Sequence, residues 1–502
     1  MTPVSASAWP EHIGKNDFVL PVPETLVNAC VATLSHDSSR PLFHDKHGWI
    51  NRKEFLQRTL ELAGSFKQIG LKKGDRILIS GPSTIDLAIA HMAALRFGLI
   101  VVPVNGLYQK AELEHVIKDA SPQAALIDHP NWKEWIDTID QGIYVSSTKV
   151  NFPTGPITKI DQVEPYDPAL IVYTSGTTGK PKGAILSQRN LLAGAHSVRL
   201  AWQWEEDDRL LLCLPLFHMH GMGVGLHGTL LVRSTAILQY GFQVQEVIQA
   251  INNHQTSMFF GVPTMYHRLA KHPQVQEMAK MRLCVSGSAP LAPSLHRKLT
   301  QEAGIEVLER YGMTETVMLV SNPYLGERRS GTVGFPLPGV KMKVEEQSGE
   351  ILVSGPNVFQ GYWNQLDANQ EVFVDSPTEH WFRTGDLGNL DEDGYLEITG
   401  RKKELIISGG YNIYPREVDD VLINHPAVEQ VAVAGLPSEE WGEEVGAWIV
   451  PVSQEKTPSL EEIREFCRQY LAAYKLPQRL VIVNDLPRNA LGKVLRHELR
   501  EN

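Results

Sequence analysis

The chain has 502 residues, of which 47 are Lys or Arg and 58 are Asp or Glu, so its formal net charge is −11. This length exceeds what one compact core accommodates, so we expect two or more packed units. A hydrophobic fraction of 42% and a charged fraction of 21% are typical of a soluble globular protein and exclude a largely disordered chain. The acidic excess argues against nonspecific binding to nucleic acid or to an anionic membrane, although a local cradle can still bind a small anion.

Cysteine usage and the amino-terminal segment bear on the cellular compartment. Cys30, Cys213, Cys284 and Cys467 lie far apart and form no C-x-x-C pair, which predicts reduced thiols. The first residues contain no basic stretch followed by an apolar run, so we expect no signal peptide. The most apolar stretch, 85–104, is interrupted by charged residues and proline, so we expect no transmembrane segment. Together these features predict a cytoplasmic protein.

Strand and helix signals alternate through the first part of the chain. Residues 77–79 are an apolar run before a Gly-Pro turn, residues 87–95 repeat apolar side chains at helical spacing, and residues 100–104 are rich in β-branched side chains. Such alternation predicts a parallel sheet with right-handed crossovers. The same pattern predicts further strands at 169–174, 209–214, 258–261 and 282–285.

The pattern changes to short strands and tight turns after residue 331, and a smaller α+β pattern follows residue 404. We therefore predict an α/β fold with a large N-terminal body of several subdomains, residues 1–402, and a small α+β C-terminal domain, residues 403–502. The strands predicted in this part are 341–345, 350–353, 394–398, 428–435 and 445–452, and the helices are 415–423 and 460–470.

The most informative segment is the run YTSGTTGKPKG at 173–183, directly after an apolar strand. Glycines let backbone N–H groups approach a ligand, hydroxyl side chains add donors, and lysines add charge, which together suit a polyphosphate better than a plain surface loop. The segment is no Walker A loop, because its glycines are too close together and proline follows the first lysine. The residues that would form the cradle are Thr174, Ser175, Gly176, Thr177, Thr178, Gly179, Lys180 and Lys182.

Two other patterns suggest different chemistry. The run GVGLHG at 223–228 satisfies G-x-G-x-x-G, so an NAD-dependent oxidoreductase is a distant alternative, although Pro215 makes the expected strand–turn–helix setting poor. His218, His220 and His227 might suggest a zinc site, but no carboxylate or thiolate joins them at ligand spacing, so we expect them in a helix or pocket wall, with zinc as the alternative. No G-x-S-x-G is present, so the main signature of a nucleophile-elbow hydrolase is missing.

Six motifs, in order, resemble those of the acyl-adenylate-forming, or AMP-binding, superfamily, which includes acyl-CoA synthetases, luciferases and peptide-synthetase adenylation domains. The resemblance runs from residue 41 to the C-terminus. It implies ATP-dependent activation of a carboxylic acid to acyl-AMP, with Mg²⁺ and with CoA as co-substrate. The matching segments are 173–183, 214–218, 311–316, 383–386, 400–404 together with 409–415, and 487–493.

The resemblance also implies roles for individual residues. Residues 174–182 would hold the β- and γ-phosphates, Glu315 would hold Mg²⁺, and Asp386 would accept hydrogen bonds from the ribose hydroxyls. Lys493 would bridge the substrate carboxylate and the α-phosphate. The catalytic residues implied are Lys493, Glu315, Thr174 and His218. The other nucleotide-binding residues implied are Gly287, Ser288, Ala289, Glu309, Arg310, Tyr311, Gly312, Thr314 and Arg401.

In enzymes of this kind the C-terminal domain is mobile and rotates between the half-reactions, and Lys403 matches the hinge. Rotation would withdraw Lys493 and bring the 409–415 loop to the site, opening a tunnel for the pantetheine arm of CoA. The sequence departs from the family pattern at Gln188, where His is usual, which leaves the local helix cap to be established. No carrier domain follows Lys493 in this sequence, so we expect free CoA as acceptor.

The segments 214–221 and 309–323 most resemble those of malonyl-CoA synthetases, which implies malonate as the acid. A short dicarboxylate needs a cation for its distal carboxylate, because burying an unpaired carboxylate is prohibitive. We predict Arg282 for this role and His218 next, and the alternative for Arg282 is a strand-end salt bridge. A medium-chain fatty acid or an aryl acid is the alternative substrate, and we expect a monomer or homodimer.

Overall fold

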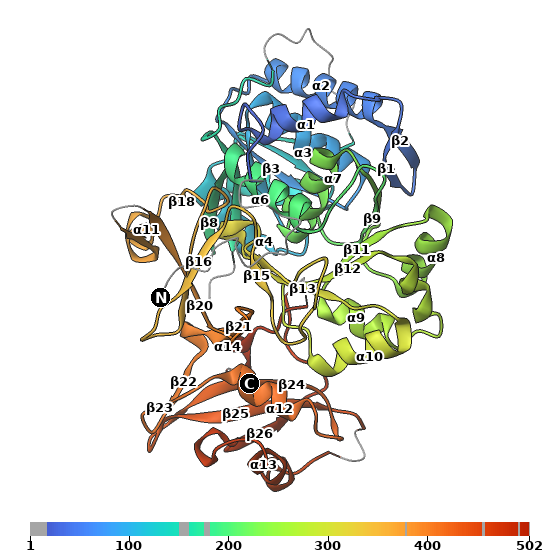
Figure 1. Cartoon of the computed structure of the whole chain (residues 1–502). Helices are drawn as coiled ribbons and strands as arrows, with labels where there is room; N and C mark the ends of the chain where they lie inside the picture. The colour runs from blue at the N-terminus through green and yellow to red at the C-terminus, as the bar shows by residue number, and fades with distance from the viewer. Residues whose placement is uncertain are drawn as a thin grey trace.

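The computed structural model describes residues 18–149, 160–174, 181–376, 379–453, 457–489 and 492–500. Figure 1 shows a large body and a smaller C-terminal domain, orange to red, beneath it. The predicted class, a large α/β body with a small α+β domain, is confirmed by this arrangement. The predicted boundary at 402/403 falls in the 3-10 turn η5 (Lys402–Glu404), which joins strands of the two parts.

The first sheet of the body has seven strands in the order β18-β8-β7-β4-β3-β5-β6. β3 pairs in parallel with both β4 and β5, as the strand and helix alternation predicts, whereas β7 and β8 form an antiparallel hairpin. The first crossover helix, α3, begins after Thr84, whose side chain accepts the N–H of Leu87, and ends at Gly98, whose φ of 85° suits glycine. The elements are β3 (Arg76–Ser80), α3 (Ile85–Phe97), β4 (Ile100–Pro103), α4 (Lys110–Ala120), β5 (Ala124–Ile127), α5 (Trp132–Ile139), β6 (Tyr144–Ser146), β7 (Pro168–Thr174), β8 (Lys182–Ser187), α6 (Gln188–Ala201) and β18 (Gly361–Tyr362).

The second sheet has nine strands in the order β15-β14-β13-β12-β11-β9-β10-β1-β2. Strands β9 to β13 run parallel and are buried except at one end residue of β9, β10 and β13, which explains their nearly continuous apolar sequences. The elements are α1 (Leu26–Leu34), β1 (Pro41–Asp45), β2 (Gly48–Asn51), α2 (Arg52–Gln68), β9 (Arg209–Leu212), η2 (His220–Leu226), α7 (His227–Val232), β10 (Thr235–Leu238), α8 (Val244–His254), β11 (Met258–Gly261), α9 (Pro263–Leu269), η3 (Val275–Lys280), β12 (Leu283–Ser286), α10 (Pro293–Ala303), β13 (Leu308–Tyr311), η4 (Thr314–Thr316), β14 (Val320–Ser321) and β15 (Phe335–Pro336).

A third sheet completes the body, and a fourth forms the C-terminal domain. In the third, β21 pairs with β20 and carries the chain toward the C-terminal domain. The fourth is built around the long hairpin β24–β25, with α12 packed against β24. The elements are β16 (Lys341–Val344), β17 (Glu350–Ser354), α11 (Leu366–Val372), β19 (Phe373–Asp375), β20 (His380–Leu390), β21 (Leu396–Arg401), β22 (Ile406–Ser408), β23 (Tyr411–Ile413), α12 (Pro415–Leu422), β24 (Val428–Ser438), β25 (Gly442–Pro451), α13 (Leu460–Arg468), η6 (Ala473–Lys475), β26 (Arg479–Ile482) and α14 (Arg496–Leu499).

The G-x-G-x-x-G run lies inside a buried helix, so the dinucleotide-site interpretation, and with it the oxidoreductase alternative, is wrong. Residues His220–Leu226 form a π-helix, η2, that continues into α7, and all are buried. The glycines permit close packing: a Cβ at Gly223 would meet Met219 at 2.2 Å, and one at Gly228 would meet Trp204 at 2.3 Å. These atoms leave no room for a pyrophosphate.

The zinc interpretation is also wrong. His227 is paired with His91 of α3, with 2.8 Å between their Nε2 atoms, rather than with His218 or His220. Across the described ranges no three His, Cys, Asp or Glu side chains come together in a way that could hold a metal. The four cysteines are buried and unpaired, as predicted.

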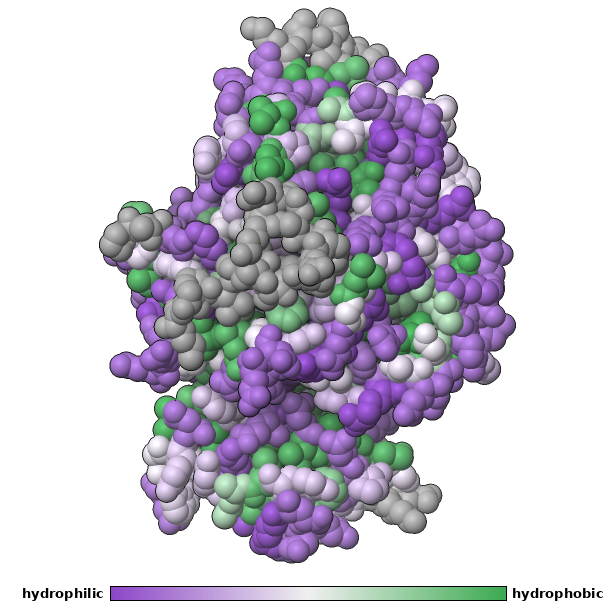
Figure 2. All heavy atoms as spheres, viewed as in Figure 1, coloured by the Kyte–Doolittle hydropathy of each residue, from purple (hydrophilic) through white to green (hydrophobic). Residues whose placement is uncertain are grey.

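The cap of α6 is intact despite the departure at Gln188. Ser187 and Asn190 form a reciprocal capping box, and the buried Oε1 of Gln188 accepts a hydrogen bond from Val27 N at 3.2 Å. Among the described residues no helix combines the length and apolar character needed to cross a bilayer. On the face drawn in Figure 2, apolar side chains are scattered among hydrophilic ones over both parts of the molecule.

Candidate active site

Most of the predicted site residues that the structure describes lie where the second sheet ends and the C-terminal domain meets the body. β12 ends at Ser286, directly before Gly287, Ser288 and Ala289, and β13 ends at Tyr311, directly before Gly312 and η4. Parallel strands place their carboxyl ends at one edge, where ligands of open α/β sheets bind. From the other side, Gly492 packs against Thr264 of α9, since a Cβ there would lie 2.9 Å from Thr264 Oγ1. Lys493 thereby reaches the same region.

Asp386 lies at the centre of a polar cluster on β20. Its Oδ2 accepts a hydrogen bond from Tyr311 Oη at 2.5 Å, and its Oδ1 lies 2.9 Å from Arg401 Nε across the β20–β21 pair. The Asp386 charge raises the pKa of Arg401, which therefore stays protonated. The structure thus brings together three residues that the sequence assigns to the nucleotide.

Glu315 is a buried carboxylate held by a residue that the sequence analysis did not identify. Tyr362 Oη donates to Glu315 Oε1 at 2.9 Å, and the Nζ of Lys182 lies 5.4 Å from the centroid of the Tyr362 ring. Burial raises the pKa of Glu315, because it disfavours the ionised form. A cation bound beside the carboxylate would oppose this effect and favour the ionised form. A carboxylate that keeps acceptor capacity beside one hydrogen bond is a ligand type that Mg²⁺ uses, so the residues present fit this metal.

Arg310 has a buried guanidinium that the protein itself leaves partly unpaired. It lies against Gly287, where a Cβ would be 2.4 Å from Arg310 Cζ. Arg310 is 6% exposed, and its Nε and Nη2 have no hydrogen-bond partner among the described residues. Burial lowers the pKa of Arg310 to about 9, so it is still charged at neutral pH. Buried polar atoms of this kind are rare in native proteins and point to a ligand.

His218 and His220 lie close enough to Arg310 for its charge to lower their pKa values. Burial, with the charges of Arg310 and Lys493, lowers the pKa of His218 to about 3, so this ring is neutral at physiological pH. The backbone N–H of His220 donates to His218 Nδ1 at 3.2 Å, so the proton of the neutral His218 ring is on Nε2, which can act as a donor. His220 has a buried Nε2 that also finds no partner in the described ranges, and its Nδ1 lies 3.4 Å from Ser288 Oγ. The sequence offered a helix or pocket wall for His220, and the structure places it in η2 beside Ser288.

Lys493 is half-buried and lies close to both cationic and anionic groups of the site. Burial and the charge of Arg401 lower the pKa of Lys493 to about 8, while Asp386 and Glu404 act in the opposite direction. The backbone N–H of Lys493 donates to Asn489 Oδ1 at 3.0 Å, which orders the turn that presents the side chain.

Arg282 lies elsewhere, and the prediction that it binds the acid is not supported by its position. It directly precedes β12, at the opposite end of the strand from Ser286. Its guanidinium pairs with the buried Asp208, with Arg282 Nε at 2.6 Å from Oδ1, and also donates to the backbone oxygens of Trp202 and Gln203. This is the strand-end salt bridge that the sequence left as the alternative.

The remaining predicted residues lie on several different elements. Thr174 and Lys182 face each other at the end of the β7–β8 hairpin. Glu309 accepts hydrogen bonds from Leu291 N at 3.0 Å and Gly331 N at 3.3 Å, and burial raises its pKa to about 7. Ser175, Gly176, Thr177, Thr178, Gly179 and Lys180 lie outside the described residues, Thr314 starts η4, and Lys403 lies in η5.

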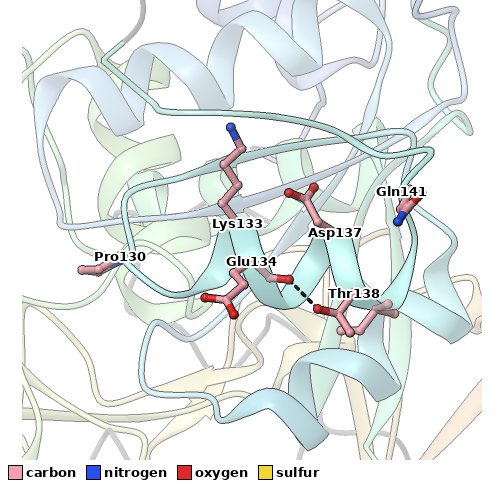
Figure 3. Close-up of a pocket in the computed structure, with 7 residues that line it drawn as sticks. Pro130, Lys133, Glu134, Asp137, Thr138 and Gln141 are labelled. Carbon is pink, nitrogen blue, oxygen red and sulfur yellow. Dashed lines mark hydrogen bonds between the residues drawn. The ribbon is translucent and has the colours of Figure 1, made fainter.

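A separate hollow lies on the surface around α5 (Figure 3). Lys133 and Asp137 project on one side of the helix and Glu134 and Thr138 on the other, and Thr138 Oγ1 donates to Glu134 O at 2.7 Å. No predicted site residue lines it. It is therefore separate from the cluster around Asp386, Arg310 and Lys493.

Comparisons with known proteins agree with this geometry. The AMP-binding enzyme family matches residues 32–363, and the AMP-binding enzyme C-terminal domain matches residues 417–493. The malonate–CoA ligase of Arabidopsis thaliana is 35% identical over 87% of this chain and 79% of its own length. A long-chain-fatty-acid–CoA ligase of Bacillus subtilis is 32% identical over 89% of each chain.

Solved structures are similar over nearly the whole chain. ATP-bound MatB from Rhodopseudomonas palustris is 34% identical with a TM-score of 0.86, covering 95% of this chain and 98% of that one. The TM-score to apo MatB, at the same coverage, is 0.76, so the arrangement of this chain is closer to the ATP-bound form. The o-succinylbenzoate CoA synthetase of Bacillus subtilis with ATP and magnesium is 30% identical with a TM-score of 0.85, covering 95% and 99%. The chain therefore belongs to the AMP-binding enzyme family, and it is an AMP-forming, ATP-dependent acid–CoA ligase.

Proposed function

We propose that the acid is a short dicarboxylate, with malonate as the best candidate, and that Arg310 binds its distal carboxylate. The observation that carries the proposal is the buried guanidinium whose Nε and Nη2 have no partner among the described residues. A fatty or aryl acid would leave this buried cation unpaired, which is unfavourable. A carboxylate would accept two parallel N–H donors from it.

The neighbours of Arg310 support an anion at this place. His220 Nε2 is a second buried polar atom lacking a partner in the described ranges, and neutral His218 offers its Nε2 proton. Gly287 leaves the guanidinium in place, because any larger residue would overlap it. The resemblance of 214–221 and 309–323 to malonyl-CoA synthetases and the Arabidopsis relative favour the same acid.

The first half-reaction follows from the charges around the site. A carboxylate oxygen of the acid bonds to the α-phosphorus of ATP as the bond to the pyrophosphate oxygen breaks. We assign to the Lys493 ammonium the role of stabilising the negative charges of the carboxylate and the α-phosphate, because it lies where the C-terminal domain meets the body. Asp386 would accept the ribose hydroxyls, and Tyr311 and Arg401 hold that carboxylate in place. Glu315 would hold Mg²⁺, which neutralises phosphate charge when bound.

In the second half-reaction the thiol sulfur of CoA bonds to the acyl carbon and AMP leaves. The site must then admit the pantetheine arm, for which we propose rotation of the C-terminal domain about Lys403. The closer likeness to ATP-bound than to apo MatB supports the interpretation that the present arrangement is the one that forms acyl-AMP.

A panel of acids in an ATP–pyrophosphate exchange assay tests the substrate. We expect malonate to give the highest kcat/KM, with succinate lower and propionate, octanoate and ferulate at least tenfold lower, because they lose hydrogen bonds to a charged group worth about 1.5–3 kcal/mol. Preference for octanoate or ferulate would refute the dicarboxylate assignment while leaving the ligase class intact.

A further inference from the structure

The backbone makes a strained turn two residues beyond Glu315. Val317 has φ 57° and ψ −69°, and Met318 N donates to Thr316 O at 2.6 Å, which closes a three-residue γ-turn. A β-branched residue rarely adopts positive φ, and this form of γ-turn is both rare and strained. Such strain persists only where the surroundings impose it, and it is concentrated at functional sites.

The Val317 side chain is held in a socket made by two helices. A Cβ at Gly194 of α6 would lie 2.6 Å from Val317 Cγ1, and a Cβ at Gly223 of η2 would lie 3.3 Å from the same atom. Val317 is 3% exposed. Gly223 belongs to the G-x-G-x-x-G run, so this motif has a packing function beneath the site.

One side chain binds both sides of the turn. Asn357 Nδ2 donates to Thr316 O and to Met318 O, each at 2.9 Å, so the amide bridges the carbonyl oxygens of the residues before and after Val317. Asn357 is 1% exposed and lies between β17 and β18. Its own segment is fixed in turn by Asn190 of the α6 cap, whose Nδ2 donates to Pro356 O at 2.8 Å and Val358 O at 2.7 Å.

The same segment also contacts Glu315 directly. Phe359 N donates to Glu315 O at 2.8 Å, and Tyr362 Oη donates to the carboxylate at 2.9 Å. Residues 357–362 therefore define both the backbone after Glu315 and the orientation of its side chain. Without the Asn357 amide, relaxation of φ at Val317 toward negative values would rotate the peptide group between Thr316 and Val317, one residue beyond Glu315.

We propose that Asn357 is a positioning residue for the metal-binding carboxylate, which acts by locking the Val317 turn. The inference rests on the proposed role of Glu315 in holding Mg²⁺. Asn357 donates to backbone oxygens of the turn, so its effect on the metal is indirect. Residues that orient a metal ligand typically change metal affinity by about 10- to 100-fold when removed.

Mn²⁺ binding to the enzyme–ATP complex, followed by electron paramagnetic resonance without acid or CoA, tests the proposal independently of turnover. We expect Asn357→Ala to weaken Mn²⁺ binding about 10- to 100-fold. Asn322→Ala is the matched control, because Asn322 is also 1% exposed and donates to two backbone oxygens, those of Glu309 at 3.3 Å and Thr332 at 2.8 Å. It should leave Mn²⁺ affinity within about twofold of wild type, since it does not hold the turn.

A double-mutant cycle separates the proposed role from general loss of structure. Glycine accepts positive φ readily, so in a Val317→Gly background the Asn357→Ala substitution should weaken Mn²⁺ binding by less than about threefold. An unchanged Mn²⁺ affinity in Asn357→Ala, or an equal loss in both backgrounds, would overturn the proposal. Asn357→Ser, which is too short to span both oxygens, gives the same comparison if the alanine variant does not fold.

Glu315→Gln separates this idea from the proposed function on which it rests. If Glu315→Gln leaves Mn²⁺ affinity unchanged, the metal role of Glu315 and the inference both fail. If Glu315→Gln weakens Mn²⁺ binding but Asn357→Ala does not, only the positioning role of Asn357 fails. The acid preference at Arg310 is untouched by either result.

Discussion

Replacing Arg310 by methionine isolates the cation that we assign to the distal carboxylate. Methionine has a similar length and no charge, so the pocket keeps much of its filling while the guanidinium is lost. Malonate bound in this variant would bury a carboxylate without its partner. Breaking a buried ion pair in this way costs about 3–5 kcal/mol, and each 1.36 kcal/mol is a factor of ten. We therefore expect kcat/KM for malonate to fall roughly 150- to 5000-fold.

The same substitution should act differently on a monocarboxylate and on the free protein. Propionate has no distal charge, so its kcat/KM should stay within about threefold or rise as the unpaired guanidinium disappears. The lowered pKa of Arg310, about 9, means that burial disfavours its charged form in the folded state. Below that pH the fold carries this penalty, so Arg310→Met should raise the Tm of the ligand-free protein at pH 7.

Arg282→Met is the matched control for Arg310→Met. Arg282 is a half-buried arginine directly before a strand of the same sheet, but it is paired with Asp208 at the far end of β12. Its loss should lower the Tm, because Asp208 would be left buried without its cation, and the ratio of malonate to propionate activity should not change. ATP–pyrophosphate exchange with both acids gives the comparison. An equal loss with malonate and propionate in Arg310→Met, or a malonate-selective loss in Arg282→Met, would refute the reasoning.

Two further predictions concern Lys493. Lys493→Ala should lower acyl-AMP formation at least about 100-fold, because removing one donor that stabilises developing negative charge costs that much. Formation of the CoA thioester from supplied acyl-AMP should stay within about threefold of wild type. Equal losses in both half-reactions would contradict the assignment. With a folded pKa of about 8, Lys493 is protonated below that pH and loses its charge above it, so kcat/KM for ATP should fall as pH rises through about 8. Lys493→Arg should move this limb to higher pH, and a limb that stays in place would assign it to another group.

Apolar runs located most strands because the parallel strands of this fold are buried on both faces. The predicted strand 169–174 is observed as Pro168–Thr174, and the predicted helix 415–423 as Pro415–Leu422. The hairpin of the C-terminal domain was predicted too short, because its strands extend to Ser438 and from Gly442. Pro437 lies near the turn of this hairpin, a position at which proline is compatible with a strand. The order of the strands could not be predicted from the sequence, because strands far apart along the chain pair with each other, as β1 does with β10.

Motif order grouped Asp386, Tyr311 and Arg401, and the structure places them together through the local pairing of β20 with β21 and a hydrogen bond from Tyr311 of β13, 75 residues from Asp386. It could not separate Arg282 from Arg310. Both arginines adjoin apolar strands of the same sheet, and the difference lies in a partner: Asp208 neutralises Arg282 from 74 residues away. Whether a buried charge is already paired depends on strand order and register, which one sequence does not show.

The glycines at 223–228 also show that a sequence pattern can fit more than one structural cause. Glycine spacing indicates that something approaches the backbone closely, but a pyrophosphate and a packed side chain place the same demand on it. Here Met219, Leu212 and Trp204 are the approaching groups. The close packing nevertheless bears on the chemistry, because Gly223 also accommodates Val317, whose strained turn follows Glu315. A motif that is wrong as a cofactor signature therefore contributes to the site through the core beneath it.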